Sequence, residues 1–96
     1  MELGSLGVWT AADRLDGGQL RDFAQLVERL GYDSIWYPES MGYESLSLAS
    51  YLLAQTSRLA VGSSIANIYA RDAITARNGL RTLSDLSGDR FVLGLG

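Results

Sequence analysis

The stretch that decides the fold is Leu83-Ser84-Asp85-Leu86-Ser87-Gly88-Asp89-Arg90-Phe91-Val92-Leu93-Gly94-Leu95-Gly96. It is interpreted as the end of a helix, a tight turn at Gly88-Asp89 and an apolar strand over 91–95. A strand this apolar is typical of a sheet that is covered on both faces, and it needs neighbouring strands on both sides.

Three more strands precede it, and a helix follows each of them. The expected strands are 6–10, 34–37 and 59–65, and the expected helices run from Asp16 to about Leu30, over 45–55, and from Asp72 with Ile74, Leu80, Leu83 and Leu86 on one side. Asp16 and Gln19 resemble a capping box, and Pro38 ends the second strand because it cannot donate to a ladder. This βαβ series predicts parallel strands with right-handed connections, in either a doubly wound sheet or part of an eight-stranded barrel.

Composition narrows the classes of function. The 96 residues predict one domain, and a net charge of −3 with no basic cluster argues against nucleic acid and anionic membranes as partners. The chain has no Cys and no His, which argues against zinc and iron–sulfur sites, thiol nucleophiles and imidazole bases, and we expect no metal. No signal peptide pattern and no long apolar run is present, so we expect a cytoplasmic chain.

The stretch 83–96 resembles the passage from helix three to strand four in the bacterial-luciferase-like flavin and deazaflavin oxidoreductases. Segments 6–9, 31–39 and 58–65 agree with that family in order and spacing, so the resemblance covers nearly the whole chain. It implies a (β/α)₈ TIM-type barrel, of which residues 1–96 form a single partial domain, the N-terminal half. It also implies hydride transfer with coenzyme F420 or, as the alternative, FMN-dependent monooxygenation. Pro38-Glu39 and Ser63-Ser64 look more like the F420 subgroup.

The first site candidate is Glu39, just beyond the end of the second strand. The resemblance places its counterpart beside the cofactor ring, where a carboxylate could accept a hydrogen bond or position a substrate proton. The alternative is that Glu39 caps its loop or pairs with an Arg. Many relatives have His at the next position, which here is Ser40, so an acid–base step through that imidazole does not carry over. Ser40 remains a candidate for contact with the cofactor.

The end of the third strand supplies the next candidates. Ser63, Ser64 and Ile65 align with a place where relatives often have a non-proline cis peptide beside the ring, and we place that bond at Ser64-Ile65. The alternative is an ordinary trans strand end. Asn67 could reach the polar edge of the cofactor or only terminate the strand.

Aromatic and charged side chains complete the set of candidates. Trp9 and Trp36 occupy matching places on the first two strands, where they could form a wall for a planar ring or be core residues. Arg71 could meet an anionic tail at a helix start, but a solvated partner of the cap is the simpler interpretation. A dinucleotide loop at Gly94-Leu95-Gly96 is disfavoured, because that motif belongs after the first strand.

An isolated half barrel has consequences for activity and assembly. Cofactor phosphates are often held after strands seven and eight of such barrels, so we expect poor cofactor affinity and little activity on a small-molecule substrate from this chain alone. Its two open edges predict association into a homo-oligomer, in the first place a dimer. The alternative function is a non-catalytic or self-assembling α/β module derived from the family.

Overall fold

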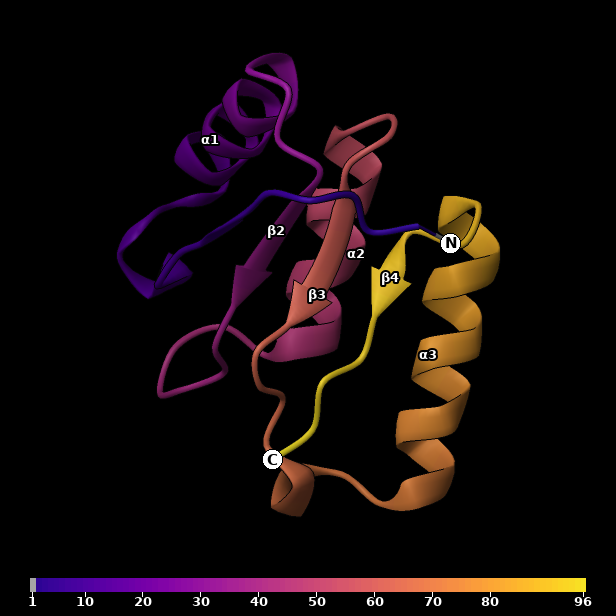
Figure 1. The fold of residues 1–96 in the computed structure, drawn as a ribbon. Helices are drawn as coiled ribbons and strands as arrows, with labels where there is room; N and C mark the ends of the chain where they lie inside the picture. Colours follow the sequence, from indigo (N-terminus) through magenta and orange to yellow (C-terminus); the bar gives the residue numbers. More distant parts are fainter. Residues whose placement is uncertain (1) are drawn as a thin grey trace.

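The computed structural model describes residues 2–96 as one parallel sheet with three long helices (Figure 1). The strands lie in the order β1-β2-β3-β4, and each pairs in parallel with the next along the chain. The elements are β1 (Gly7–Trp9), η1 (Ala12–Arg14), α1 (Gly17–Arg29), β2 (Ser34–Tyr37), α2 (Ser45–Gln55), β3 (Ala60–Ser63), η2 (Ile68–Ala70), α3 (Ala73–Ser87) and β4 (Phe91–Val92). The predicted βαβ series is confirmed.

The helix ends follow the predicted capping. Asp16 Oδ1 accepts from the N–H of Gln19 at 2.9 Å, and Gln19 Oε1 accepts from the N–H of Asp16 at 3.0 Å, which confirms the capping box. Asp72 caps α3 by accepting from Thr75 N at 2.7 Å. Gly88 ends α3 with φ 69°, a conformation that glycine adopts without steric cost. Strand β2 and helix α2 have the predicted bounds.

The other strands are shorter than predicted, and for β3 and β4 the reason is that the ladder between them is interrupted. Beyond Ser63 the chain leaves the sheet at Ser64 and Ile65, and it returns to the neighbouring segment as an isolated parallel bridge between Ala66 and Leu95. Ala66 N donates to Gly94 O at 2.7 Å across this gap. Residues 12–14, interpreted from the sequence as a loop, form a single 3₁₀ turn, and a second such turn covers residues 68–70.

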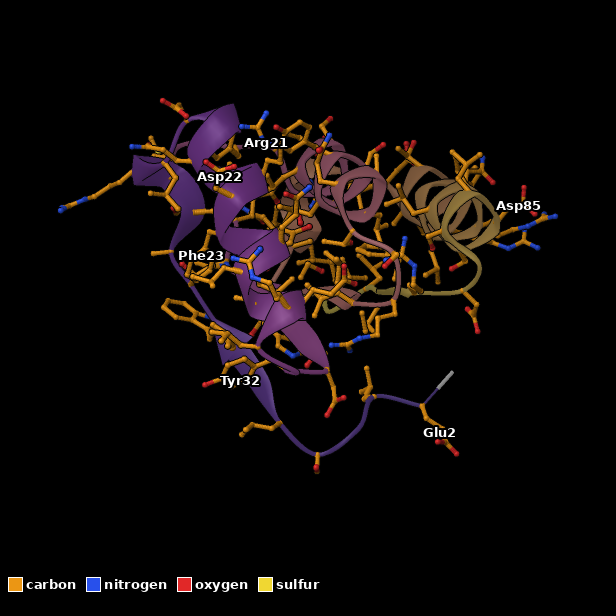
Figure 2. The ribbon with its side chains drawn as sticks, turned by 90° about the horizontal axis from the view of Figure 1, so that it is seen from above. Glu2, Arg21, Asp22, Phe23, Tyr32 and Asp85 are labelled. Carbon is orange, nitrogen blue, oxygen red and sulfur yellow. The ribbon has the colours of Figure 1, made fainter. Side chains whose placement is uncertain are left out.

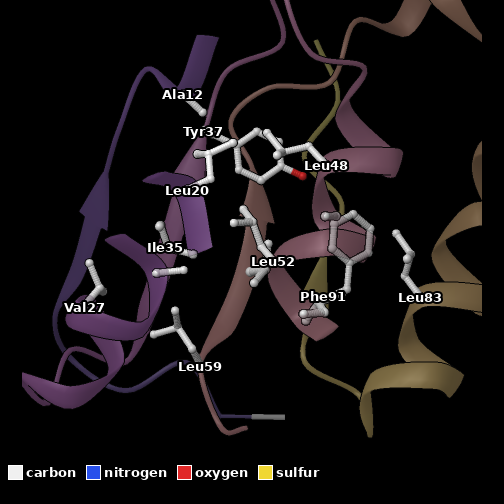
Figure 3. Close-up of a cluster of buried hydrophobic side chains, with 14 residues drawn as sticks. Ala12, Leu20, Val27, Ile35, Tyr37, Leu48, Leu52, Leu59, Leu83 and Phe91 are labelled. Carbon is white, nitrogen blue, oxygen red and sulfur yellow. The ribbon is translucent and has the colours of Figure 1, made fainter. Parts of the chain in front are cut away.

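All three long helices lie on one face of the sheet, as the view from above shows (Figure 2). One residue of each strand packs against the core beneath these helices, and the four are neighbours across the sheet: Val8, Ile35, Val61 and Phe91. Buried leucines fill the space between the two layers (Figure 3), and the core consists of Ala12, Leu20, Ala24, Val27, Ile35, Tyr37, Leu48, Ala49, Leu52, Leu53, Leu59, Val61, Leu83 and Phe91. Burial of these side chains is the main favourable contribution to folding.

Fewer apolar residues of helix α3 are buried than its sequence pattern predicts. Ala76 and Leu83 are buried, whereas Ile74 and Leu86, which were expected on the same side of the helix as Leu83, are 73% and 75% exposed. The reason is position: α3 lies at the edge of the helix layer, and its main contacts are with α2 and β4. Leu80 packs against the core as well and is partly buried.

The opposite face of the sheet carries no helix in the described structure. Trp9, Trp36, Gly62 and Val92 lie side by side on it, one from each strand. The indole of Trp36 extends across β3, where a Cβ on Gly62 would overlap its six-membered ring. Its Nε1 donates to Ser34 Oγ at 2.9 Å. A large side chain opposite a glycine is typical of a layer that fills a barrel interior.

Candidate functional site

The loops that follow β1, β2 and β3 meet at the carboxyl end of the sheet. A shallow hollow lies between the second and third of these loops, lined by Glu39, Ser40, Met41, Gly42, Tyr43, Glu44, Asn67 and Ala70. The predicted residues Glu39, Ser40 and Asn67 are therefore brought together. In barrels of parallel strands, this end of the sheet is where reacting groups gather.

Glu39 is held by four donors from two loops. Oε1 accepts from Asn67 N at 2.8 Å and from Arg71 at 2.9 Å, while Oε2 accepts from Ser45 N at 2.7 Å and from Arg71 at 2.7 Å. Both the Glu39 and the Arg71 side chains are more than 90% buried. These contacts agree with the alternative in which Glu39 pairs with an Arg, whereas a role in proton transfer stays a prediction.

This environment favours the ionised carboxylate. The hydrogen bonds from Arg71 outweigh the opposing effect of burial and, with the N–H groups of Asn67 and Ser45, lower the pKa of Glu39 from 4.5 to about 2. A carboxylate with such a pKa holds no proton at neutral pH. Donation of a proton by Glu39 would require the pair with Arg71 to open first.

The lowered pKa predicts a pH dependence of stability. A carboxyl group whose pKa is lower in the folded state contributes stability above its unfolded value, and this contribution is lost as the pH falls through the folded value. The Glu39 contribution should therefore be complete above about pH 5 and should decrease by about 2 kcal/mol between pH 6 and pH 3. Urea denaturation of the wild type and Glu39→Gln at several pH values measures it. Plotted against pH, the free energies of unfolding of the two proteins should converge toward pH 3. A constant difference between them at all pH values contradicts the prediction.

Ser40 is occupied by a contact within the protein. Its hydroxyl donates to Asp13 Oδ2, and Asp13 Oδ1 accepts from Tyr43 N at 3.1 Å. The bond from Ser40, followed by that from Tyr43, lowers the pKa of Asp13. Asp13 follows β1, so this carboxylate ties the first loop to the second, and the predicted contact of Ser40 with a cofactor would compete with it.

The end of β3 has the predicted backbone. The peptide between Ser64 and Ile65 is cis, as the resemblance implied. Ser63 is buried, and its hydroxyl donates to Gly94 O at 2.9 Å and accepts from Gly94 N at 3.0 Å. Ser64 is half-buried, whereas the side chain of Ile65 is 44% exposed. Of the three predicted residues, Ser63 thus holds β4 in place, and Ile65 is accessible to a ligand.

Asn67 and Arg71 have structural partners that the sequence did not reveal. The side chain of Asn67 accepts from Tyr69 N at 2.9 Å and caps η2. Arg71 is buried against Glu39 and also contacts Glu44, so the expectation of a solvated cap partner at Arg71 was wrong. The physical reason is that Arg71 follows η2, a 3₁₀ turn that the sequence did not predict. That turn places its guanidinium beside the loop after β2.

The uncovered face of the sheet offers the surface that a planar ring requires. Trp9 is 58% exposed there at the carboxyl end of β1, and Trp36 next to it is half-buried. Neither indole belongs to the core between the sheet and the helices. Exposed indoles stack well on planar rings, so the position of Trp9 agrees with the predicted wall for such a ring, and its contact with a cofactor stays a prediction.

Residues 2–96 present neither a cluster of metal ligands nor a membrane-spanning helix. This part of the chain contains no group of three or more acidic side chains arranged to hold a metal ion. None of its helices has the length and apolar character needed to cross a bilayer.

Comparison with known proteins identifies the family. The model of the family described as luciferase-like monooxygenase matches residues 1–96, the full length of the chain. The chain belongs to the luciferase-like monooxygenase family. The prediction from the sequence is thereby confirmed, and the fold is the α/β barrel type of this family.

Individual luciferase-like relatives share modest identity with the chain. A 5,10-methylenetetrahydromethanopterin reductase of Methanolobus tindarius is 28% identical over 81% of this chain and 24% of its own length. A Mycobacterium tuberculosis protein named as a coenzyme F420-dependent oxidoreductase is 30% identical over 100% of this chain and 27% of its own. The chain thus spans about a quarter of the curated relatives it matches.

A solved luciferase-like structure has the same fold. The coenzyme F420-dependent tetrahydromethanopterin reductase of Methanopyrus kandleri superposes with a TM-score of 0.86 and 22% identity, over 96% of this chain and 26% of that one. The four strands are half of a barrel's eight, but the share of length is smaller because these relatives are longer than a minimal barrel.

Proposed function

We propose that the chain contributes part of an oxidoreductase site for a planar redox cofactor, coenzyme F420 in the first place and FMN as the alternative. The observation that carries the proposal is the exposure of Trp9 and Ile65 at the end of the sheet where the loops converge. The names of the Mycobacterium tuberculosis and Methanopyrus kandleri relatives favour F420. The substrate is proposed to be a small molecule.

The residues of this chain would hold and orient the cofactor. Trp9 would contact one part of the ring and Ile65 another, with the amide of Asn67 near its polar edge. The cofactor, when bound, supplies the hydride transfer itself. Burial of the ring against apolar groups would exclude water from its reactive face. Glu39 and Ser40 would act from behind this surface through the loops that they hold.

Cofactor titration tests the proposal. Ring fluorescence should change saturably when the chain is added to F420 or FMN, and comparison of the two shows which is preferred. Trp9→Ala should weaken binding about five- to tenfold, because stacking on one indole is lost. The matched control is Leu86→Ala, an exposed apolar residue on the helix side of the sheet, which should bind as the wild type does. Equal affinity of both variants would contradict this site.

A second candidate is a self-assembling module without turnover. Within the described residues β1 pairs only with β2, and β4 only with β3, so each has one edge available for a strand of another copy. We propose a homodimer as the first product of such pairing. Absence of saturable binding at high micromolar cofactor, together with a dimer in sedimentation velocity, would favour this candidate.

A further inference from the structure

The guanidinium of Arg71 joins three segments of the candidate site. Its two terminal nitrogens bind both oxygens of Glu39 at 2.9 and 2.7 Å. One of them also donates to the carbonyl of Asn67 at 2.7 Å, and the other to Glu44 Oε2 at 3.1 Å. Glu44 caps α2, so a single side chain connects the end of β2, the start of α2 and the turn before α3. A bidentate fork of this kind fixes orientation as well as distance.

The same cluster anchors the backbone beside the exposed face. Glu39 N donates to Ile65 O at 3.0 Å, and Asn67 N donates to Glu39 Oε1 at 2.8 Å. Asn67 O in turn accepts from Arg71. The segment from Ile65 to Asn67 is therefore held at both ends by Glu39 and Arg71. The side chain of Ile65 projects from it and is 44% exposed.

We propose that Arg71 is a positioning residue of the cofactor site, which acts through Glu39 to fix the Ile65–Asn67 backbone against which a planar ring rests. This inference rests on the function proposed above. Arg71 does not touch the ligand, because its side chain is 7% exposed and its terminal nitrogens already contact Glu39, Asn67 and Glu44. Glu39 connects Arg71 to the backbone. Its two carboxylate oxygens accept hydrogen bonds from Arg71 and from the N–H groups of Ser45 and Asn67.

Charge explains why an arginine is required for this role. A carboxylate that is mostly buried is costly without a partner, and removal of its cation leaves that cost uncompensated. Lysine would supply the charge as a single point without the planar fork. We therefore expect Arg71→Lys to retain part of the function and Arg71→Met to lose most of it.

Cofactor titration of Arg71 variants tests the proposal. Arg71→Met should weaken binding of F420 or FMN by at least tenfold and Arg71→Lys by about threefold. Arg81→Met removes an exposed arginine of α3 and should bind as the wild type does. Titrations are made at a temperature where circular dichroism shows each variant to be folded. Wild-type affinity in both Arg71 variants would overturn the proposal.

The pH profile separates positioning from a general loss of structure. The charged and titratable groups that face Glu39 are Arg71 and Glu44, with Tyr37 on β2 near all three. A phosphate monoester such as that of FMN itself titrates at about pH 6, so affinity is compared with that of the wild type at each pH. In Arg71→Met the Glu39 carboxyl loses its cation and would titrate at higher pH, so the loss of affinity relative to the wild type should vary between pH 5 and pH 8. In the double variant Glu39→Gln/Arg71→Met this ratio should stay constant. A pH-independent loss in Arg71→Met would indicate a merely structural role and overturn the proposal.

Hydrogen exchange gives a readout that needs no cofactor. Peptides covering 64–71 and 39–45 should exchange faster in Arg71→Met than in the wild type, while peptides from α1 remain unchanged. If the wild type binds neither cofactor, the proposed function fails, and the exchange data then decide about Arg71 alone. Faster exchange at 64–71 would support its holding role, and unchanged exchange would overturn that role too.

Discussion

Substitution of Arg90 by Met should lower the free energy of unfolding by about 4 kcal/mol. The guanidinium of Arg90 donates to the carbonyls of Leu53, Leu59 and Ser87 at 2.9 Å each. It also binds the carbonyl of Thr56 at 3.2 Å and its hydroxyl at 3.1 Å. The last turn of α2, the start of β3 and the end of α3 thus share one side chain.

Methionine retains most of the apolar stem of Arg90 but none of its donors. Four carbonyls would lose a charged partner at once, two of them at the C-terminus of α2, and each unsatisfied buried acceptor costs about 1–3 kcal/mol. The favourable interaction of a cation with the C-terminal end of the α2 dipole is lost as well. These effects share one group and are therefore not additive.

Chemical denaturation with urea measures the loss in Arg90→Met. Arg81→Met is the matched control, because Arg81 is exposed on α3 and its removal should change stability by less than about 0.5 kcal/mol. If Arg90→Met is too unstable to fold, Arg90→Lys should still fold with an intermediate midpoint. A loss below about 1 kcal/mol in Arg90→Met would show that water replaces the guanidinium without cost.

Substitution of Gly62 by Ala should destabilise the chain by about 3 kcal/mol, although alanine adds only one methyl group. That methyl would overlap the six-membered ring of Trp36. The indole is tethered to Ser34 at 2.9 Å, so it has to break this bond and move toward the open side of the sheet. Its emission should shift to longer wavelength, and Trp9→Phe as the background leaves Trp36 as the single reporter.

A double variant isolates the contact between Gly62 and Trp36. Trp36→Leu should make Gly62→Ala nearly neutral, with a coupling energy of at least about 1.5 kcal/mol. Gly18→Ala is the control, since a Cβ there meets no atom closer than 3.5 Å and alanine favours a helix. An equal loss from Gly62→Ala in both backgrounds would rule out the clash with Trp36.

Local signals in the sequence predicted most of the fold. Asp16 and Asp72 mark the starts of α1 and α3 through hydrogen bonds within three residues, and Pro38 marks the end of β2 because it cannot donate to a ladder. The apolar pattern over 45–55 placed α2 correctly. The exposure of Ile74 and Leu86 was missed because it depends on what α3 packs against, and periodicity contains no such information. The cis peptide at Ser64-Ile65 was predicted from the resemblance to the family and not from the spacing of apolar residues, whereas the break in the ladder beside it was not predicted.

The sequence predicted several residues of the candidate site but not the hydrogen bonds and ion pairs that join them. Glu39, Ser40 and Asn67 were placed at one end of the sheet because parallel strands end together. Their partners Asp13 and Arg71 lie about thirty residues away in the sequence, and a local pattern cannot show such pairs. Glu44, which contacts Arg71, could have been found as an N-cap by its position just before the α2 pattern.

The order β1-β2-β3-β4 also determines how the sheet can form. Each strand pairs with its successor, so every new helix and strand docks on an edge made by residues that precede it in the chain. Such a sheet can assemble stepwise during synthesis at the ribosome, without waiting for a distant segment to close it. Each step covers the previous growing edge and exposes a new one, while the outer edge of β1 stays unpaired, so misassembly can begin at either of these two edges.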